Sequence, residues 1–208
     1  MGWILTDPRF FDFRRTIVII DPNNFENFNR VLAGVVAPRP IAFVSTISDN
    51  GLVNLSPFSF FTEVAEEPPM ILFASNTTDT LLNIRDTREF VVNFVSKSIA
   101  DAMMLTSGEY PKEVNEFDVA GLTQLPSEKI RPPRVKESPV NIECKLDQII
   151  ELDADHDLIL GEVVFLHIYD EMISGYHVNH KKLNPVSSLT GDKYCATSDV
   201  FELFRPKL

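Results

Sequence analysis

The sequence predicts a mainly β protein with a few short helices, folded as an antiparallel barrel that closes on itself. Runs of β-branched and aromatic residues dominate the apolar sequence, and helical periodicity is confined to short stretches. Strands and helices do not alternate along the chain as they would in a doubly wound parallel sheet. An antiparallel barrel accounts for both observations, because hairpins and short loops can connect its strands.

The chain is organised around a predicted hairpin at residues 38–61. Residues 41–47 have the character of one strand, residues 52–61 form the returning strand, and Gly51 lies in the turn, where it is free to adopt a positive φ. Small hydroxyl side chains lie at the strand ends beside rigid apolar ones, which suits a flat ligand with an anionic part. These residues are Ser45, Thr46, Ser56, Ser59, Pro57, Phe58, Phe60 and Phe61.

Two further elements are predicted ahead of the hairpin. Residues 16–20 resemble a short strand, and Asn24 can begin a helix that continues to about Val36 with apolar residues at helical spacing. We expect this helix to form a lid over one end of the barrel. Residues 1–24 are interpreted as an N-terminal extension and residues 25–208 as the folded domain.

Short elements and then a long excursion are predicted beyond the hairpin. Residues 70–74 and 89–96 are apolar runs typical of buried strands, a helix is predicted at 81–88 between them, and Ser98 can begin another helix. Residues 106–137 carry many prolines and charges. An irregular segment of this length in a compact domain indicates a functional or interface role.

Two long strands follow the excursion. Residues 139–152 alternate between apolar and polar side chains, and the phase of the alternation changes at Ile149 and Ile150, which predicts a β-bulge there. Residues 158–169 are nearly all apolar, so we expect this strand to be buried on both faces.

A second candidate site is the run of small polar residues at 75–80, directly before the predicted helix. A helix N-terminus carries unpaired N–H groups and partial positive charge, so it can hold a phosphate. Thr78 and Thr80 add hydroxyl donors. The plainer interpretation, in which Thr78 or Asp79 only caps the helix, remains open.

His156 is the histidine with the most suggestive neighbours, because it lies between Asp155 and Asp157. Two carboxylates favour the charged form of an imidazole, which otherwise titrates near neutral pH. A solvated loop histidine is the alternative. His167 lies in an apolar run and is interpreted as a core or interface residue, and no spacing in the chain predicts a metal site.

The composition excludes several classes of partner. With 19 basic and 30 acidic residues the formal charge is −11, which argues against binding to nucleic acid or to an anionic membrane. Two cysteines are too few for a disulfide framework, which favours a reducing cytoplasmic location. We find neither a signal peptide nor an apolar run long enough to span a membrane.

An ordered series of motifs resembles the flavin reductase-like family, the FMN-binding split barrels. The series is PRPIAFVST, NLSPFSFF, EEPPMILF, DTLLNIRDTREFVVNFV, DHDLILGEV and GDKY, and it covers roughly residues 25–195. The resemblance implies a Greek-key antiparallel split barrel that binds FMN without a covalent bond. It also implies a homodimer with a flavin near each of two equivalent interface sites.

The resemblance assigns roles to residues of both candidate sites. It places Ser45, Thr46, Ser56 and Ser59 along the ring and ribityl chain and Phe58 and Phe60 against the ring, and it adds Asn54 and Pro57 to the cofactor-binding set. It places Ser75, Thr78 and Thr80 at the phosphate, although family members often have lysine where this chain has Thr78. His156 then resembles a residue on the nicotinamide side and is the candidate catalytic residue.

The function implied is hydride transfer from NADH or NADPH to FMN, as in an NAD(P)H-dependent flavin reductase. Two alternatives remain. The protein could be a flavoredoxin-like electron carrier that a redox partner protein reduces, or it could bind flavin without turnover. No nucleotide motif in the chain distinguishes NADH from NADPH.

Overall fold

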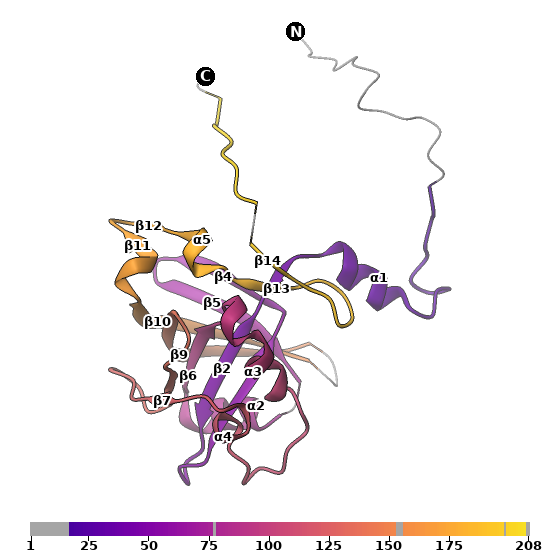
Figure 1. The fold of residues 1–208 in the computed structure, drawn as a ribbon. Helices are drawn as coiled ribbons and strands as arrows, with labels where there is room; N and C mark the ends of the chain where they lie inside the picture. The colour runs from indigo at the N-terminus through magenta and orange to yellow at the C-terminus, as the bar shows by residue number, and fades with distance from the viewer. Residues whose placement is uncertain (1–16, 77, 153–155, 198, 207–208) are drawn as a thin grey trace.

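The computed structural model describes residues 17–206 except 77, 153–155 and 198. Its centre is a curved seven-stranded antiparallel sheet in the order β3-β2-β6-β9-β10-β5-β4 (Figure 1). The strands are β2 Ala42–Ile47, β3 Val53–Phe58, β4 Phe61–Glu66, β5 Pro69–Ser75, β6 Glu89–Phe94, β9 Val140–Glu151 and β10 Asp157–Ile168. The mainly β fold class is therefore confirmed.

Smaller elements surround this sheet. The helices are α1 Phe28–Val35, α2 Asp79–Thr87, α3 Ala100–Leu105, α4 Glu116–Ala120 and α5 His180–Leu183, with 3-10 turns η1 Lys97–Ile99 and η2 Asp170–Met172. The short strands are β1 Arg39–Pro40, β7 Gln124–Leu125, β8 Arg134–Val135, β11 Ile173–Ser174, β12 His177–Val178, β13 Val186–Ser188 and β14 Tyr194–Ala196.

The sheet does not close, so the expectation of a closed barrel is wrong. Among the described residues, no strand ladder joins the edge strands β3 and β4. The predicted strand at 52–61 is divided by a bend at Ser59 and Phe60. The part after the bend pairs with β5 and does not continue the ladder of β3. An amide of β3 that faces outward, that of Leu55, donates instead to the carboxylate of Glu116 on α4.

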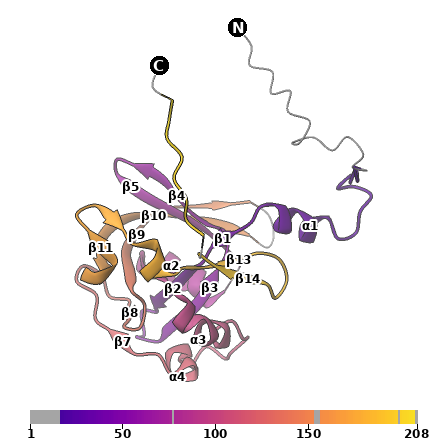
Figure 2. The ribbon, with the colours of Figure 1, turned by 45° about the horizontal axis from the view of Figure 1, so that its top comes forward.

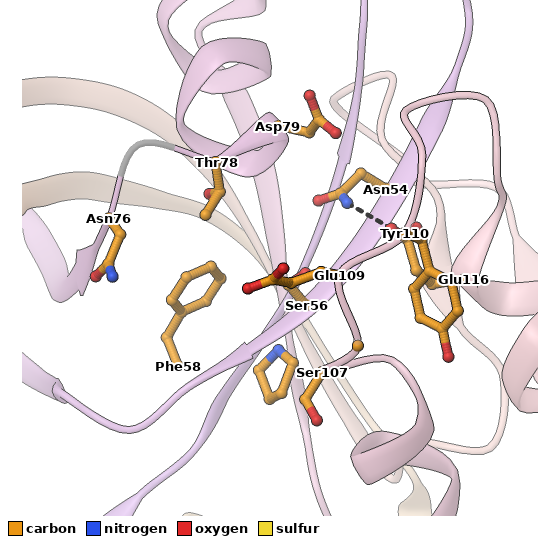
Figure 3. Close-up of a pocket in the computed structure, with 12 residues that line it drawn as sticks. Asn54, Ser56, Phe58, Asn76, Thr78, Asp79, Ser107, Glu109, Tyr110 and Glu116 are labelled. Atoms are coloured by element: carbon orange, nitrogen blue, oxygen red, sulfur yellow. Dashed lines mark hydrogen bonds between the residues drawn. The ribbon is translucent and has the colours of Figure 1, made fainter. Parts of the chain in front are cut away.

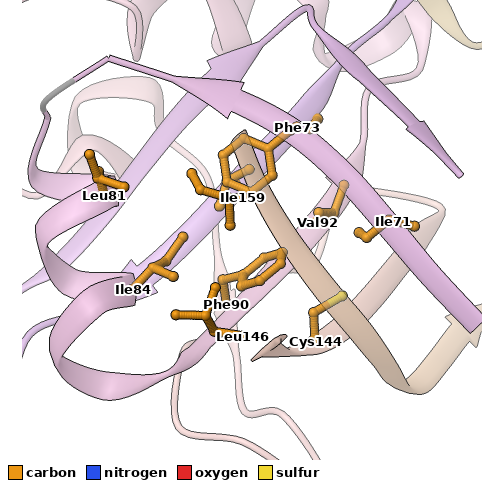
Figure 4. Close-up of a cluster of buried hydrophobic side chains, with 11 residues drawn as sticks. Ile71, Phe73, Leu81, Ile84, Phe90, Val92, Cys144, Leu146 and Ile159 are labelled. Carbon is orange, nitrogen blue, oxygen red and sulfur yellow. The ribbon is translucent and has the colours of Figure 1, made fainter. Parts of the chain in front are cut away.

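The main core lies inside the curve of the sheet, and α2 completes it (Figure 4). Phe73 and Phe90 pack edge to face at 5.5 Å between ring centroids, and Leu81 and Ile84 of α2 reach the same cluster. Cys144 is buried there, and burial raises the pKa of its thiol. A second core lies on the other face of β2 and on β3, against α3 and α4.

The excursion at 106–137 is fixed to the sheet by buried polar side chains that bind its backbone. Ser45 donates to the Pro133 carbonyl at 2.5 Å, and Asn93 accepts from the Val135 amide at 2.9 Å. The carboxylate of Glu143 accepts from the amides of Glu128 and Lys129. These bonds satisfy backbone groups that an irregular segment would otherwise leave unpaired.

Several sequence-based expectations are wrong in detail. Residues 17–20 form no strand and are mostly exposed, and residue 16 lies outside the described part of the chain. Helix α1 begins at Phe28 instead of Asn24, has no buried residue, and extends away from the sheet in two views, so it is not a lid over a barrel end (Figures 1 and 2).

The long hairpin also departs from expectation. The bulge on β9 lies at Asp147, where the register to β10 shifts, and not at Ile149 and Ile150. Strand β10 is buried only near its start, and Phe165 and Leu166 near its end are exposed. The apolar run at 158–169 therefore includes side chains that the single chain leaves on its surface.

Candidate functional site

A cavity of about 440 Å³ opens where β3, the start of α2 and the excursion meet (Figure 3). Three segments contribute its lining. The residues are Asn54, Ser56, Pro57 and Phe58 of β3; Asn76, Thr78 and Asp79 at the start of α2; and Ser107, Gly108, Glu109, Tyr110 and Glu116 of the excursion.

Strand β3 supplies a polar row and an aromatic wall. Asn54, Ser56 and Phe58 alternate along the strand and therefore lie on one face. The Phe58 ring packs against the buried Phe73 ring at 5.1 Å between centroids, so the core fixes the wall. Pro57 has no N–H to donate, which suits an edge strand beside a cavity.

The start of α2 supplies donors. Thr78 is the N-cap residue and has extended backbone angles, but its side chain makes no capping hydrogen bond. Its hydroxyl lies 3.2 Å from the Ser75 hydroxyl instead. The simple capping interpretation therefore does not account for the Thr78 side chain, and this helix start faces the cavity.

A buried hydrogen-bond chain joins the three segments beneath the cavity. The Thr80 hydroxyl donates to Oδ1 of Asn54 at 2.6 Å, and Nδ2 of Asn54 donates to Oε1 of Glu116 at 2.9 Å. Oε2 of Glu116 accepts from the Leu55 amide at 3.1 Å. Burial raises the pKa of Glu116 above its ordinary value, although these hydrogen bonds oppose the shift.

The hydroxyls of β2 do not line the cavity. Ser45 and Thr46 are fully buried, Ser45 is bonded to the excursion, and Thr46 accepts from Nδ2 of Asn83 at 3.0 Å. Of the four predicted strand-end hydroxyls, only that of Ser56 belongs to this cavity. Ser59 lines a smaller adjoining hollow of about 200 Å³.

His156 and Phe60 lie at a separate apolar groove of about 530 Å³, beside the C-terminal half of α1. Their ring centroids are 6.4 Å apart, and the Arg39 guanidinium lies over the Phe60 ring at 5.7 Å. Arg39 is held by the carbonyls of Ala33, Val36 and Leu189. Asp155, the predicted neighbour of His156, lies outside the described residues.

The lining of the first cavity suits the ring and ribityl chain of a flavin better than it suits the flavin phosphate. Phe58 offers a flat face and Ser56 and Ser107 offer hydroxyls. The charged residues among its described lining are Asp79, Glu109 and Glu116, all acidic. A phosphate there has to be held by the amides of α2 and by hydroxyls, because no described lining residue is cationic.

Sequence reasoning missed the contribution of the excursion. Its length indicated a functional segment, but nothing in the sequence signals that Ser107, Tyr110 and Glu116 return to β3. Among the described residues, no group of histidine, cysteine and carboxylate side chains could hold a metal ion, and no helix is long and apolar enough to cross a membrane.

Several solved structures are similar to this chain over most of its length. Nitrilotriacetate monooxygenase component B from Bacillus cereus is 32% identical with a TM-score of 0.87, over 91% of this chain and 100% of that one. Pseudomonas fluorescens 2-nitrobenzoate 2-nitroreductase is 33% identical with a TM-score of 0.85, over 91% and 96%. A split barrel protein from Shewanella frigidimarina shares the fold, with 23% identity and a TM-score of 0.82 over 88% and 96%.

A domain-level match covers most of the chain. Residues 36–183 match the flavin reductase like domain, from the end of α1 to the end of α5. The match includes β3, the start of α2, the excursion and His156, so it contains the whole lining of the cavity and the part of the groove lining from Val36 onward. The chain belongs to the flavin reductase-like family and has its split-barrel fold.

Proposed function

We propose that the protein is an FMN-binding oxidoreductase of the flavin reductase type that oxidises NADH or NADPH. The observation that carries this proposal is that β3 and α2 bring an aromatic wall and a helix N-terminus to one cavity (Figure 3). The bound flavin would accept the hydride, while the chain supplies position and electrostatics.

Each group of lining residues would bind a different part of the ligand. Phe58, with Pro57 beside it, would wall the ring, and Ser56 would hydrogen-bond the ribityl chain. Thr78 and the first amides of α2 would hold the phosphate. Asp79 in the first turn opposes a dianion electrostatically, so directed hydrogen bonds must provide the affinity.

The buried residues of the predicted cofactor-binding set would hold the walls of the site in place. Their side chains would not contact the ligand. Thr80 and Asn54 join α2 to β3, and Ser45 joins β2 to the excursion. Thr46 is bonded to Asn83 of α2, and Ser75 to Thr78. We keep these residues in the proposed cofactor site in this supporting role.

We assign the groove at His156 to the reductant. It adjoins the bend at Phe60, and the Arg39 cation over that ring suits an aromatic ligand that carries phosphates. We expect His156→Ala to slow single-turnover reduction of the flavin without releasing it. An unchanged rate would remove His156 from the reaction.

We also propose that the protein works as a homodimer. Apolar side chains of α1 and the end of β10 are exposed in the single chain, among them Val35 and Leu166. Exposed apolar side chains on these two elements mark them as candidate interaction surfaces. We keep residues 25–208 as the domain and residues 1–24 as its extension, and we propose a cytoplasmic location.

A second candidate is an electron carrier whose FMN is reduced by a partner protein. The charge of −11 would favour a basic partner. The Bacillus cereus structure is one component of a monooxygenase, which suggests that reduced flavin could serve a second protein. Flavin binding without turnover is the third outcome.

Anaerobic titration distinguishes these functions. We expect purified protein reconstituted with FMN to lose its yellow colour when NADH or NADPH is added, and to release FMN on denaturation. Bleaching only with an added reductase would indicate the electron carrier. Release of FAD, or failure to bind FMN in excess, would refute the cofactor assignment.

A further inference from the structure

Among the described residues, the hydrogen bonds from the excursion to the edge of β3 are made by one side chain, that of Glu116. We propose that Glu116 is a positioning residue of the flavin cavity, whose carboxylate fixes Asn54 and the outer edge of β3. The excursion would thereby set the shape of the cavity floor. This inference rests on the proposed function, because it concerns how the same cavity is held ready for its ligand.

The carboxylate is placed to hold two elements at once. Glu116 is 6% exposed, and its two oxygens accept from two different groups of β3, the Asn54 amide and the Leu55 N–H. Asn54 is itself 9% exposed and uses its other amide atom to accept from Thr80. Every polar atom of the Asn54 side chain is therefore occupied, and α2, β3 and α4 are bonded in series.

The position of Glu116 is rigid because of its neighbours. Asn115 caps α4 by accepting from the Phe117 amide at 3.1 Å, and Phe117 is fully buried in the second core. Glu116 lies between the cap and this anchor. A shift of the excursion would therefore move the carboxylate, and with it the β3 residues that line the cavity.

The direction of each hydrogen bond allows a test by exchange of groups. In Glu116→Gln, the new NH₂ group is a donor, and it faces another donor, either the Asn54 amide or the Leu55 N–H. In Asn54→Asp, two carboxylates face one another. When both substitutions are combined, the new amide at position 116 can accept from Leu55 and donate to the new carboxylate at position 54. That carboxylate can also accept from Thr80. The double variant therefore restores every bond and leaves the net charge unchanged.

Two measurements are needed, flavin affinity and amide exchange at Leu55. Because 1.4 kcal/mol corresponds to a factor of ten, loss of one charge-assisted bond should weaken FMN and riboflavin alike by about tenfold in each single variant. We expect the double variant to recover to within about threefold of the wild type. The Leu55 amide, measured by hydrogen exchange in the flavin-free protein, should lose protection in both single variants and regain it in the double variant.

Glu113→Gln is the matched control, because Glu113 is exposed and lies three residues earlier in the same segment. It should change neither measurement. Restored Leu55 protection without restored flavin affinity would overturn the inference, since Glu116 would then only stabilise the fold. Wild-type protein that binds no flavin would refute the proposed function, and Leu55 exchange would still decide whether Glu116 holds the edge of β3.

Discussion

Thr78 is the side chain on which the phosphate assignment depends most directly. Thr78 lines the cavity at the N-terminus of α2, and hydrogen bonds to a charged group contribute about 1.5–3 kcal/mol each. We expect Thr78→Val to weaken FMN binding by about ten- to a hundredfold, because valine keeps the shape and removes the donor. Riboflavin, which has no phosphate, should lose almost nothing in the same fluorescence titration.

Thr80 provides the comparison for this experiment. Its hydroxyl is fully buried and donates to Asn54, so Thr80→Val should weaken FMN and riboflavin equally. Equal losses for both ligands in Thr78→Val would mean that the phosphate lies elsewhere. The two threonines are only two residues apart, and the difference between them lies in where the helix directs each hydroxyl.

Gly161 is required by close packing, not by an unusual backbone angle. A Cβ at this position would lie 2.3 Å from a ring atom of Phe90 and 3.3 Å from Cβ of Cys144. We expect Gly161→Ala to lower the free energy of unfolding by about 2 kcal/mol, since overpacking forces the core to shift. Denaturant unfolding measures this change.

Gly34 is the control for that substitution. A Cβ at Gly34 in α1 would meet Thr190 at ordinary contact distance, 3.5 Å. Gly34→Ala should be neutral or slightly stabilising, because alanine is the better helix former. Destabilisation of similar size at both positions would indicate that Phe90 is not what excludes a side chain at Gly161.

At the scale of elements, the buried carboxylate of Glu143 holds the excursion to β9. It accepts from two excursion amides and lies 2.6 Å from Nε2 of His167 on β10. Burial alone would raise the pKa of Glu143, but the bonds from Glu128, His167 and Lys129 together lower it below its ordinary value. The ionised form is therefore the one that stabilises the native fold.

The pH dependence of stability follows from the direction of that shift. A lowered native pKa gives stability that is present above the unfolded value, about 4.3 for glutamate, and is lost as the pH falls through the native value. We expect Glu143→Gln to lower the free energy of unfolding at pH 7 by about 3 kcal/mol and to flatten its fall between about pH 5 and 3.

The exposed Glu128 is the control, and Glu128→Gln should leave the acid limb of the curve unchanged. An unaltered curve in Glu143→Gln would mean that other carboxylates determine acid stability. The excursion would then depend less on this single anchor than its hydrogen bonds suggest.

At the scale of elements, the sequence predicts the strands but not the side-chain contacts that join distant segments. β2, β5, β6 and β9 lie within a residue or two of expectation, because each carries the pattern of a strand with a buried face. The roles of Ser45 and Glu116 could not be predicted, since their partners lie 88 and 61–62 residues away in the chain. Local periodicity contains no information about such contacts.

At the scale of the whole molecule, the apolar surface is larger than a single chain of this kind should leave uncovered. Val35 on α1 is 74% exposed and Leu166 on β10 is 53% exposed, and neither is covered by another described element. Residues 199–206 add further exposed apolar side chains in an extended segment that leaves the body of the protein (Figures 1 and 2). A second copy of the chain is the partner that we propose for these surfaces.

Substitution of an exposed residue tests this proposal sharply, because a solvated side chain tolerates charge whereas an interface does not. We expect light scattering on the wild type to give twice the chain mass of 23.5 kDa, and on Val35→Asp or Leu166→Asp to give a folded monomer. Leu82→Asp, at a partly exposed position on α2, should remain a dimer. A wild-type mass of 23.5 kDa that does not change with concentration, together with full flavin binding, would show that one chain suffices for the site.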